Sequence, residues 1–375
     1  MRVLFLYLAQ IHQIPHTLPI AMEMARTGEA EVHLASASDD HLRYMKELGG
    51  LYPDAAVTYR RLFLPPPLRT LSRLRHATTL PKVPALLFNL AYLRSFDAIV
   101  VPERTSLLLK KLGLGRTRLV WTGHGGGDRA HGYTENVGRF DFVLLPGEKL
   151  VRRHRQAGNL SEGHYGVGGY AKFDLVERMA ERRAPLFAND RPTVVYNPHF
   201  RPGLSSWPEM GWQVLDFFAQ SRDYNLVFAP HMRLFDPPTP EKYAPFRRFA
   251  DLPHMRIDLG STASVDMTYT GQADLYLGDV SSQIAEFTIR PRPLVFLNPR
   301  RTPWAGDPNY RSWELGPVVE DIADLGAALG EALATQDEMR ERRAAYFADT
   351  FDLGHAGPSA PRGARAILDY LKGPA

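Results

Sequence analysis

Three short segments of the chain carry the residue types that phosphate chemistry uses, and each directly follows an apolar run. They are residues 123–129 (GHGGGDR), 197–201 (NPHFR) and 229–233 (APHMR). Histidine can exchange a proton near neutral pH, and arginine and protonated histidine donate hydrogen bonds to phosphate oxygens. Consecutive glycines can form an anion nest, although a flexible turn with a surface histidine is the alternative for the first segment. The candidates are His124, Gly125, Gly126, Arg129, His199, Arg201 and His231.

A fourth segment, residues 279–286 (DVSSQIAE), is typical of a sharp turn that opens a helix. Serine hydroxyls cap helices by accepting from first-turn amides, and a helix start attracts anions through its free amides and its dipole. We therefore expect Asp279, Ser281 and Ser282 to hold part of a nucleotide diphosphate, with helix capping alone as the alternative. Glu286, one turn further on, is a candidate ribose ligand, and a solvated surface position is its alternative.

The apolar runs that precede these segments alternate with helical patterns along the chain. This alternation predicts an α/β fold with parallel sheets, in which ligands bind at the carboxyl ends of the strands. We expect two Rossmann-type domains, residues 1–184 and 193–375, joined by a proline-containing linker and facing a central cleft. The last helix is a candidate to pack back on the N-terminal domain. The predicted strands lie at residues 3–9, 31–35, 96–101, 118–122, 140–145, 164–169, 193–197, 225–229, 255–259, 275–277, 294–297 and 318–319.

The bulk composition excludes several classes of protein. A chain of 375 residues, 44% apolar and 23% charged, suits two globular domains. The absence of cysteine excludes disulfides and thiolate metal sites, and no metal or cofactor motif is present, so none is expected. A net charge of +4 does not imply nucleic acid. No apolar stretch reaches the length of a membrane helix, and residues 1–9 fit a buried strand better than a signal sequence, so we expect a cytoplasmic protein.

Residues 55–96 differ from the rest of the chain because they hold no acidic residue and interleave arginines with leucines and prolines. The prolines predict short, broken helices. A basic, apolar segment of this kind can lie on an anionic membrane surface or hold an anionic acceptor. The alternative is a leucine core with a solvated arginine face. We expect peripheral contact with the inner face of the plasma membrane through this segment, including Arg69, Arg73 and Arg75.

The spacing of these segments resembles one enzyme family. The turn DVSS at residues 279–282, with the strand RPLVF at 292–296, resembles the Asp-Tyr-Ser-Ser signature of the CDP-glycerol glycerophosphotransferases, GT-B-fold enzymes of teichoic acid synthesis. Pro230-His231 resembles the family's Arg-Pro-His-Pro motif, and His124-Gly125 its His-Gly-Thr-Pro-Leu-Lys motif. The likeness extends from about residue 121 to the C-terminus. The chain departs from the family at Gly126–Arg129, Ala229, Met232 and Val280.

The resemblance implies a GT-B-like fold and transfer of glycerophosphate, or a related phospho-polyol, from a CDP-linked donor to a hydroxyl of a lipid-linked or glycan acceptor. In that reaction His124 is the general base, His231 neutralises the donor phosphates, and Asp279 orients His231 or a donor hydroxyl. Ser281 and Ser282 hold phosphate, and Arg201 adds charge opposite the leaving CMP. The departures leave three alternatives open: a GT-B glycosyltransferase with a nucleotide-sugar donor, an isomerase like the UDP-sugar 2-epimerases, and a non-catalytic nucleotide-binding scaffold.

Overall fold

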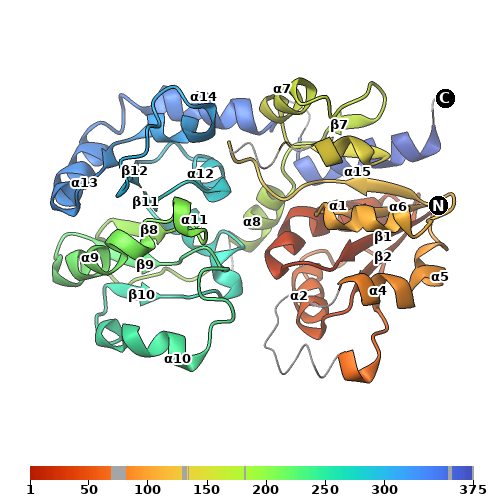
Figure 1. Cartoon of the computed structure of the whole chain (residues 1–375), viewed down its shortest axis with the longest axis horizontal. Helices are drawn as coiled ribbons and strands as arrows, with labels where there is room; N and C mark the ends of the chain where they lie inside the picture. The colour runs from red at the N-terminus through yellow and green to blue at the C-terminus, as the bar shows by residue number, and fades with distance from the viewer. Residues whose placement is uncertain (69–81, 129–132, 134, 181–182, 354–356, 374–375) are drawn as a thin grey trace. The chain divides into compact units, whose positions relative to one another are not determined.

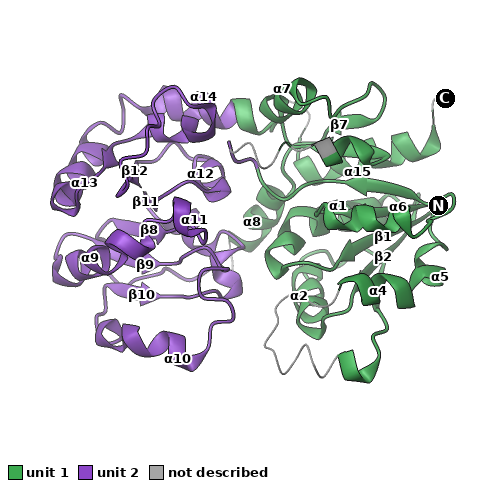
Figure 2. Ribbon diagram, in the orientation of Figure 1, with its two compact units in different colours: residues 1–125, 133–181, 349–375 green, residues 126–132, 182–348 purple. Residues whose placement is uncertain are grey.

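The chain was analysed as a computed structural model, which describes all residues except 69–81, 129–132, 134, 181–182, 354–356 and 374–375 (Figure 1). The described residues form two compact units (Figure 2). Unit 1 comprises residues 1–125, 133–181 and 349–375, and unit 2 comprises residues 126–132 and 182–348. The chain therefore leaves unit 1 for the first time directly after Gly125.

Unit 1 is built on a seven-stranded parallel sheet with the order β3-β2-β1-β4-β5-β6-β7. Because every pairing is parallel, all the strands end at the same edge. Strand β1 is interior to the sheet and pairs Val3 with Val32 of β2 and with Ala98 of β4. The strands are β1 (Arg2–Tyr7), β2 (Glu31–Ser36), β3 (Val57–Arg61), β4 (Ala98–Val101), β5 (Arg118–Trp121), β6 (Phe142–Leu145) and β7 (Tyr165–Val167).

Helices cover both faces of this sheet, as the alternating side chains of β1 require. Val3, Phe5 and Tyr7 pack in one core with α1, α2, α8 and α15, whereas Leu4 and Leu6 pack in the other with α4 to α7. The helices are α1 (Ile14–Arg26), α2 (Asp39–Gly49), α4 (Lys82–Phe88), α5 (Leu90–Leu93), α6 (Leu108–Lys111), α7 (Glu148–Gln156), α8 (Lys172–Ala180) and α15 (Ser359–Lys372), with 3-10 turns η1 (Ile11–Gln13), η2 (Thr105–Leu107) and η4 (Glu135–Arg139).

Unit 2 has the same architecture, built on a six-stranded parallel sheet of order β10-β9-β8-β11-β12-β13. Its strands are β8 (Thr193–Asn197), β9 (Asn225–Phe228), β10 (Met255–Ile257), β11 (Leu275–Gly278), β12 (Leu294–Leu297) and β13 (Val318–Val319). Its helices are α9 (Trp207–Gln220), α10 (Pro240–Tyr243), α11 (Thr268–Gln272), α12 (Ser282–Phe287), α13 (Leu325–Ala334) and α14 (Arg340–Thr350), with 3-10 turns η5 (Pro202–Leu204), η6 (Ala244–Phe249), η7 (Thr262–Ser264), η8 (Pro308–Leu315) and η9 (Ile322–Asp324). The predicted class, two α/β units with parallel sheets, is confirmed.

Two local predictions in unit 1 were wrong. Residues 57–61 form the edge strand β3, whereas broken helices were expected throughout 55–96; the arginines of this strand obscure its alternation, as is common on edge strands. The first helix begins at Ile14 rather than Leu18, since Pro15 sits in its first turn, where proline is tolerated. His16 is therefore helical and not part of a loop. The arginines at 69, 73 and 75 lie outside the described residues.

Candidate functional site

The three polar segments predicted in unit 2 come together at the carboxyl edge of its sheet. Strands β9, β8 and β11 are neighbours, so the residues that follow them, His231, His199 and Asp279, lie side by side. The ring centroids of His199 and His231 are 5.7 Å apart, and the amide of His231 donates to the carbonyl of Pro198 at 3.0 Å. The parallel sheet thus assembles this group from segments up to 80 residues apart.

Asp279 lies beneath this group with no exposed surface. Its Oδ2 accepts hydrogen bonds from the backbone amides of His199, at 2.7 Å, and Ser206, at 2.9 Å, and its buried Oδ1 has no partner among the described residues. Burial raises the pKa of Asp279 to about 7, while hydrogen bonds from Ser206 and His199 act in the opposite direction. Asp279 therefore positions the loop after β8 and the start of α9, and its contact with a donor stays a prediction.

His199 and His231 are both oriented by the same local contact. The amide of Arg201 donates to Nδ1 of His199 at 3.0 Å, and the amide of Arg233 donates to Nδ1 of His231 at 3.2 Å. A backbone amide can only donate, so Nδ1 of each ring is unprotonated and the proton lies on Nε2. Both imidazoles are therefore set to donate from Nε2 without carrying a charge.

Phe200 provides an aromatic surface between these two imidazoles. Its ring lies 4.5 Å from each of the His199 and His231 rings. The guanidinium carbon of Arg233 lies 4.2 Å from the Phe200 ring centroid, and that of Arg201 lies 5.7 Å from it. These cation–π contacts keep two arginines at the edge of the sheet where anion donors were predicted.

The turn after β11 has the predicted cap. Ser281 is the N-cap of α12, and its Oγ accepts from the amide of Gln283 at 3.2 Å. Ser282 opens the helix, and a side chain at Gly127 would lie 3.5 Å from it. Glu286 is buried at 2% exposure, so the surface alternative for this residue was wrong. Its contact with a ribose stays a prediction.

His124 occupies the corresponding edge of unit 1, in the loop after β5. Its Nδ1 lies 2.7 Å from the carbonyl oxygen of Pro102, in the loop after the adjacent strand β4. A carbonyl oxygen can only accept, so Nδ1 carries the proton and Nε2 has a free lone pair. This tautomer is opposite to that of His199 and His231, and it is the one that a general base requires.

The surroundings of His124 favour its neutral form. Partial loss of hydration lowers its pKa from the ordinary value of 6.5, and the cations Arg104 and Lys82 act in the same direction, whereas the Pro102 carbonyl and Glu103 oppose them. Glu103 itself accepts from the amide of Thr105 and from the Ser106 hydroxyl. The neutral form of His124 is therefore favoured at neutral pH.

Two further histidines of unit 1 were not among the predicted site residues. The ring centroids of His12 and His16 lie 5.5 and 6.3 Å from that of His124. Both follow β1, which lies two strands away from β5. Their positions after the end of a predicted strand were the available signal, because that edge of a parallel sheet collects polar groups.

The glycine loop after His124 continues into unit 2. Gly125 is the last residue of its segment of unit 1, and Gly126 is buried in unit 2. Asp128 is 4% exposed, and its Oδ2 accepts from the Ser312 amide at 3.2 Å and from the Tyr346 hydroxyl at 2.8 Å. Asp128 therefore anchors this loop within unit 2. Arg129, a predicted phosphate ligand, lies outside the described residues.

Several solved structures share this architecture. The wall teichoic acid polymerase TagF with CDPG matches with a TM-score of 0.65 and 13% identity, over 99% of this chain and 88% of that chain. The UDP-GlcNAc 2-epimerase of Neisseria meningitidis bound to UDP-GlcNAc also has a TM-score of 0.65, with 10% identity over 99% and 100% of the two chains. The S. aureus MnaA–UDP structure has a TM-score of 0.60 and 12% identity, over 99% and 96%.

The fold is of the GT-B type. No protein-family model and no curated protein matches the chain. At identities of 10% to 13%, the structural likeness carries the fold and nothing finer. The chemistry must therefore be argued from this chain's own residues.

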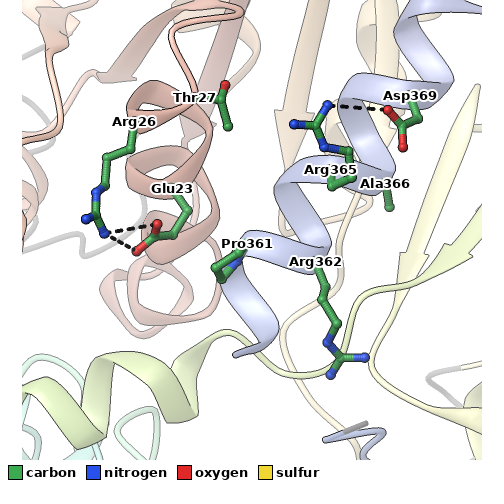
Figure 3. A pocket seen from close by; sticks show the side chains of 8 residues that line it. All are labelled: Glu23, Arg26, Thr27, Pro361, Arg362, Arg365, Ala366 and Asp369. Carbon is green, nitrogen blue, oxygen red and sulfur yellow. Dashed lines mark hydrogen bonds and ion pairs between the residues drawn. The ribbon is translucent and has the colours of Figure 1, made fainter. Parts of the chain in front are cut away.

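A hollow of about 780 Å³ lies elsewhere in unit 1 (Figure 3). It is an open groove between the C-terminal half of α1 and α15. Its charged side chains pair with one another, Arg26 with Glu23 and Arg365 with Asp369. His16 and Arg26 are ten residues apart on α1, or about 15 Å along the helix. We therefore place the candidate site at the strand ends and not in this groove.

Neither a metal-binding cluster nor a membrane-spanning helix is found among the described residues. No group of three or more His, Asp or Glu side chains is placed to hold a metal ion in that part of the chain. No helix among the same residues combines the length and apolar character needed to cross a bilayer.

Proposed function

We propose that this protein is a transferase that moves a glycerophosphate, or a related phospho-polyol, from a CDP-linked donor to an acceptor hydroxyl in cell-envelope polymer or glycolipid synthesis. The observation that carries the proposal is the opposite tautomers of the histidines. His124 has a free Nε2 lone pair because its Nδ1 is bonded to Pro102, whereas His199 and His231 present Nε2 protons. Phosphoryl transfer needs one proton acceptor and several donors to phosphate oxygens.

In the proposed reaction, residues of the two units have different roles. In unit 1, Nε2 of His124 accepts the proton of the acceptor hydroxyl, and the resulting oxygen attacks the phosphorus that bears the polyol. The bond from that phosphorus to the bridging oxygen breaks, and CMP leaves with the electron pair. In unit 2, His199, His231 and Arg201 donate to the phosphate oxygens, and the first amides of α12 with Ser281 and Ser282 hold the remaining charge. Asp279 holds the His199 loop in place.

TagF is described as a wall teichoic acid polymerase, and its structure with CDPG shares this fold. That likeness, together with the resemblance of the DVSS turn and the Pro-His loop, supports a CDP-linked donor and an acceptor from the cell envelope.

Donor identity can be tested by calorimetric titration of the whole protein. CDP-glycerol should bind more tightly than UDP-GlcNAc and GDP-mannose, because the proposal assigns the site of unit 2 to a CDP-linked ligand. His231→Phe should weaken binding of CDP-glycerol about tenfold or more, since it removes a hydrogen bond to a charged group. The matched control is His164→Phe, at an exposed histidine of unit 1. The histidine of unit 2 at position 254 is unsuitable because its side chain is buried. Tighter binding of a nucleotide sugar than of CDP-glycerol would contradict the proposed donor.

The second candidate is an isomerase of the UDP-sugar 2-epimerase kind. It is favoured by the UDP-GlcNAc-bound epimerase structure, which has the same TM-score as TagF. A glycosyltransferase with a nucleotide-sugar donor would use the same residues of unit 2. Incubation with UDP-GlcNAc alone distinguishes the two, because an isomerase converts it without any acceptor. We expect no conversion.

Unit 1 also carries an exposed apolar patch, formed by Phe63, Val83, Leu87 and Phe88, within the basic segment. Their exposures are 58%, 48%, 48% and 55%, and the patch contains four of the seven exposed large apolar side chains among the described residues. The rings of Phe63 and Phe88 are 6.0 Å apart. The side chain of Asn89 bonds to both the amide and the carbonyl of Phe63, at 2.9 and 2.8 Å, which fixes this backbone. Exposed aromatic side chains within a basic segment suit an anionic lipid surface.

Substitution of both Phe63 and Phe88 by serine should reduce sedimentation with vesicles of phosphatidylglycerol and phosphatidylcholine at least tenfold. The reason is the loss of apolar area that inserts among the lipids, at about 25 cal/mol per Å². Leu353→Ser removes an exposed apolar side chain of unit 1 outside the patch, 40% exposed, and should sediment like the parent. Equal sedimentation of all three proteins would contradict membrane contact through this patch.

A further inference from the structure

A small cavity of about 20 Å³ lies at the carboxyl edge of the unit 1 sheet, next to the loop of His124. Its wall includes the backbone of Gly123 and Gly125 after β5 and of Gly169 after β7, with the rings of His16 and Tyr170. None of the residues that line it is acidic. A cavity of this size holds one atom the size of a water oxygen.

His16 lines this cavity with an unsatisfied polar atom. The side chain is 8% exposed, and its buried Nδ1 has no hydrogen-bond partner among the described residues. An unpaired buried nitrogen costs about 1–3 kcal/mol relative to a bonded one. An unpartnered nitrogen on a side chain that lines a cavity points to a ligand atom that completes the bond.

The three glycines add further unused donors. In the described part of the chain, the amides of Gly123, Gly125 and Gly169 make no hydrogen bond. Gly123 and Gly169 have φ angles of +65° and +74°, which a residue with a side chain rarely adopts. The cavity therefore offers donors from the backbone as well as an imidazole.

The charges that face His16 are all basic. Burial lowers the pKa of His16 well below its ordinary value, and Lys172, which is 3% exposed at the start of α8, acts in the same direction, as do His124 and His12. His16 also lies in the first turn of α1, a helix of 13 residues whose positive dipole end faces this edge. An anion at the mouth of the cavity would be attracted by Lys172 and by this helix end.

We infer that His16, Lys172 and the three glycine amides form a subsite for one phosphate group, with one phosphate oxygen in the cavity. The inference deepens the proposed function and rests on it, because the phosphate would belong to the acceptor whose hydroxyl His124 deprotonates. The ligand class is a phosphate ester of a polyol. Free inorganic phosphate has the same recognition chemistry, so the test must separate the two.

The direct test is NMR of the whole protein labelled with ¹⁵N-histidine. Inorganic phosphate and sn-glycerol 3-phosphate are titrated separately at constant ionic strength, with sodium chloride and glycerol as controls. The resonances of His16 should shift saturably with glycerol phosphate, and its pKa should rise because a bound anion stabilises the imidazolium. Saturation by inorganic phosphate at the same concentrations would identify a free-phosphate site and overturn the assignment to the acceptor.

Variants provide an independent readout. His16→Asn and His16→Phe should each raise KM for a polyol-phosphate acceptor about tenfold or more, while KM for the CDP-linked donor stays unchanged. His164→Asn is the matched control, because His164 is exposed, lies in the same unit, and its ring donates from Nδ1 to the carbonyl of Asp141 at 3.0 Å. Should either His16 variant fail to fold, the titration of the parent protein still decides.

The outcomes of the two proposals can be told apart. If CDP-glycerol is turned over but no phosphate moves the His16 resonances, the cavity holds only water, and the subsite is overturned while the function stands. If glycerol phosphate moves His16 but CDP-linked donors neither bind nor react, the subsite stands and the transferase proposal fails. A response to sodium chloride equal to the response to phosphate also overturns the subsite.

Discussion

His124→Asn should lower kcat for transfer from a CDP-linked donor by about 10²–10⁴-fold, the usual contribution of a positioned general base. Asparagine is the informative replacement because its amide group can still donate to the Pro102 carbonyl, which accepts from Nδ1 of the parent histidine at 2.7 Å. Only the Nε2 lone pair is lost. Donor affinity, measured with CDP-glycerol by calorimetry, should be unchanged because the proposed donor groups belong to unit 2.

The pH profile gives a second measure of the same assignment. His124 must be neutral to accept a proton, so kcat/KM of the parent should rise with pH through the pKa of His124 and then level off. Since desolvation and the cations Arg104 and Lys82 lower that pKa, the rising limb should lie below pH 6.5. His164→Asn should leave both rate and profile unchanged. Full turnover by His124→Asn, or a limb above pH 6.5, would refute the role of His124 as the base.

The regular elements were accessible from sequence because their signals are local. The apolar runs that became β8 and β12 are bounded by proline and asparagine, and the predicted cap at Ser281 is confirmed by its bond to the Gln283 amide. The edge strand β3 was missed because alternate residues of its charged sequence VTYRR face solvent. Its position in the sheet depends on pairing with β2, which lies in a different part of the sequence.

The candidate site was only partly accessible, because its chemistry depends on contacts between strand ends. The sequence identified His124, His199 and His231 but not their tautomers. Those are set by the carbonyl of Pro102 and by the amides of Arg201 and Arg233. Histidine spacing alone carries no information about which ring nitrogen is bonded.

The burial of Asp279 was also beyond the sequence, and it leads to a large expected effect on stability. Its folded-state pKa of about 7 lies above the ordinary value of 3.8. Between these values the folded protein binds more protons at Asp279 than the unfolded chain does, so this residue's contribution to stability falls as pH rises from about 4 to 7 and is constant above. The difference corresponds to about 4 kcal/mol at most.

Asp279→Asn should abolish this fall, because the amide oxygen can still accept from the amides of His199 and Ser206 while no charge is buried. The free energy of unfolding of the variant relative to the parent should therefore increase steadily between pH 4 and 7. This free energy can be measured by urea titration followed by tryptophan fluorescence, because four of the five tryptophans belong to unit 2. One of them, Trp313, donates to the backbone carbonyl of Asp279 at 3.1 Å. Asp216→Asn, at an exposed carboxylate of α9, is the matched control.

Asp279→Ala separates positioning from charge. It removes the acceptor of both amides, so the loop from His199 to Ser206 loses two hydrogen bonds at once, and donor binding should weaken about tenfold or more because His199 is no longer held. Asp279→Asn should retain most of that affinity. If instead Asp279→Asn loses donor binding as completely as Asp279→Ala, the carboxylate itself contacts the donor, and its role as a support for the loop is wrong.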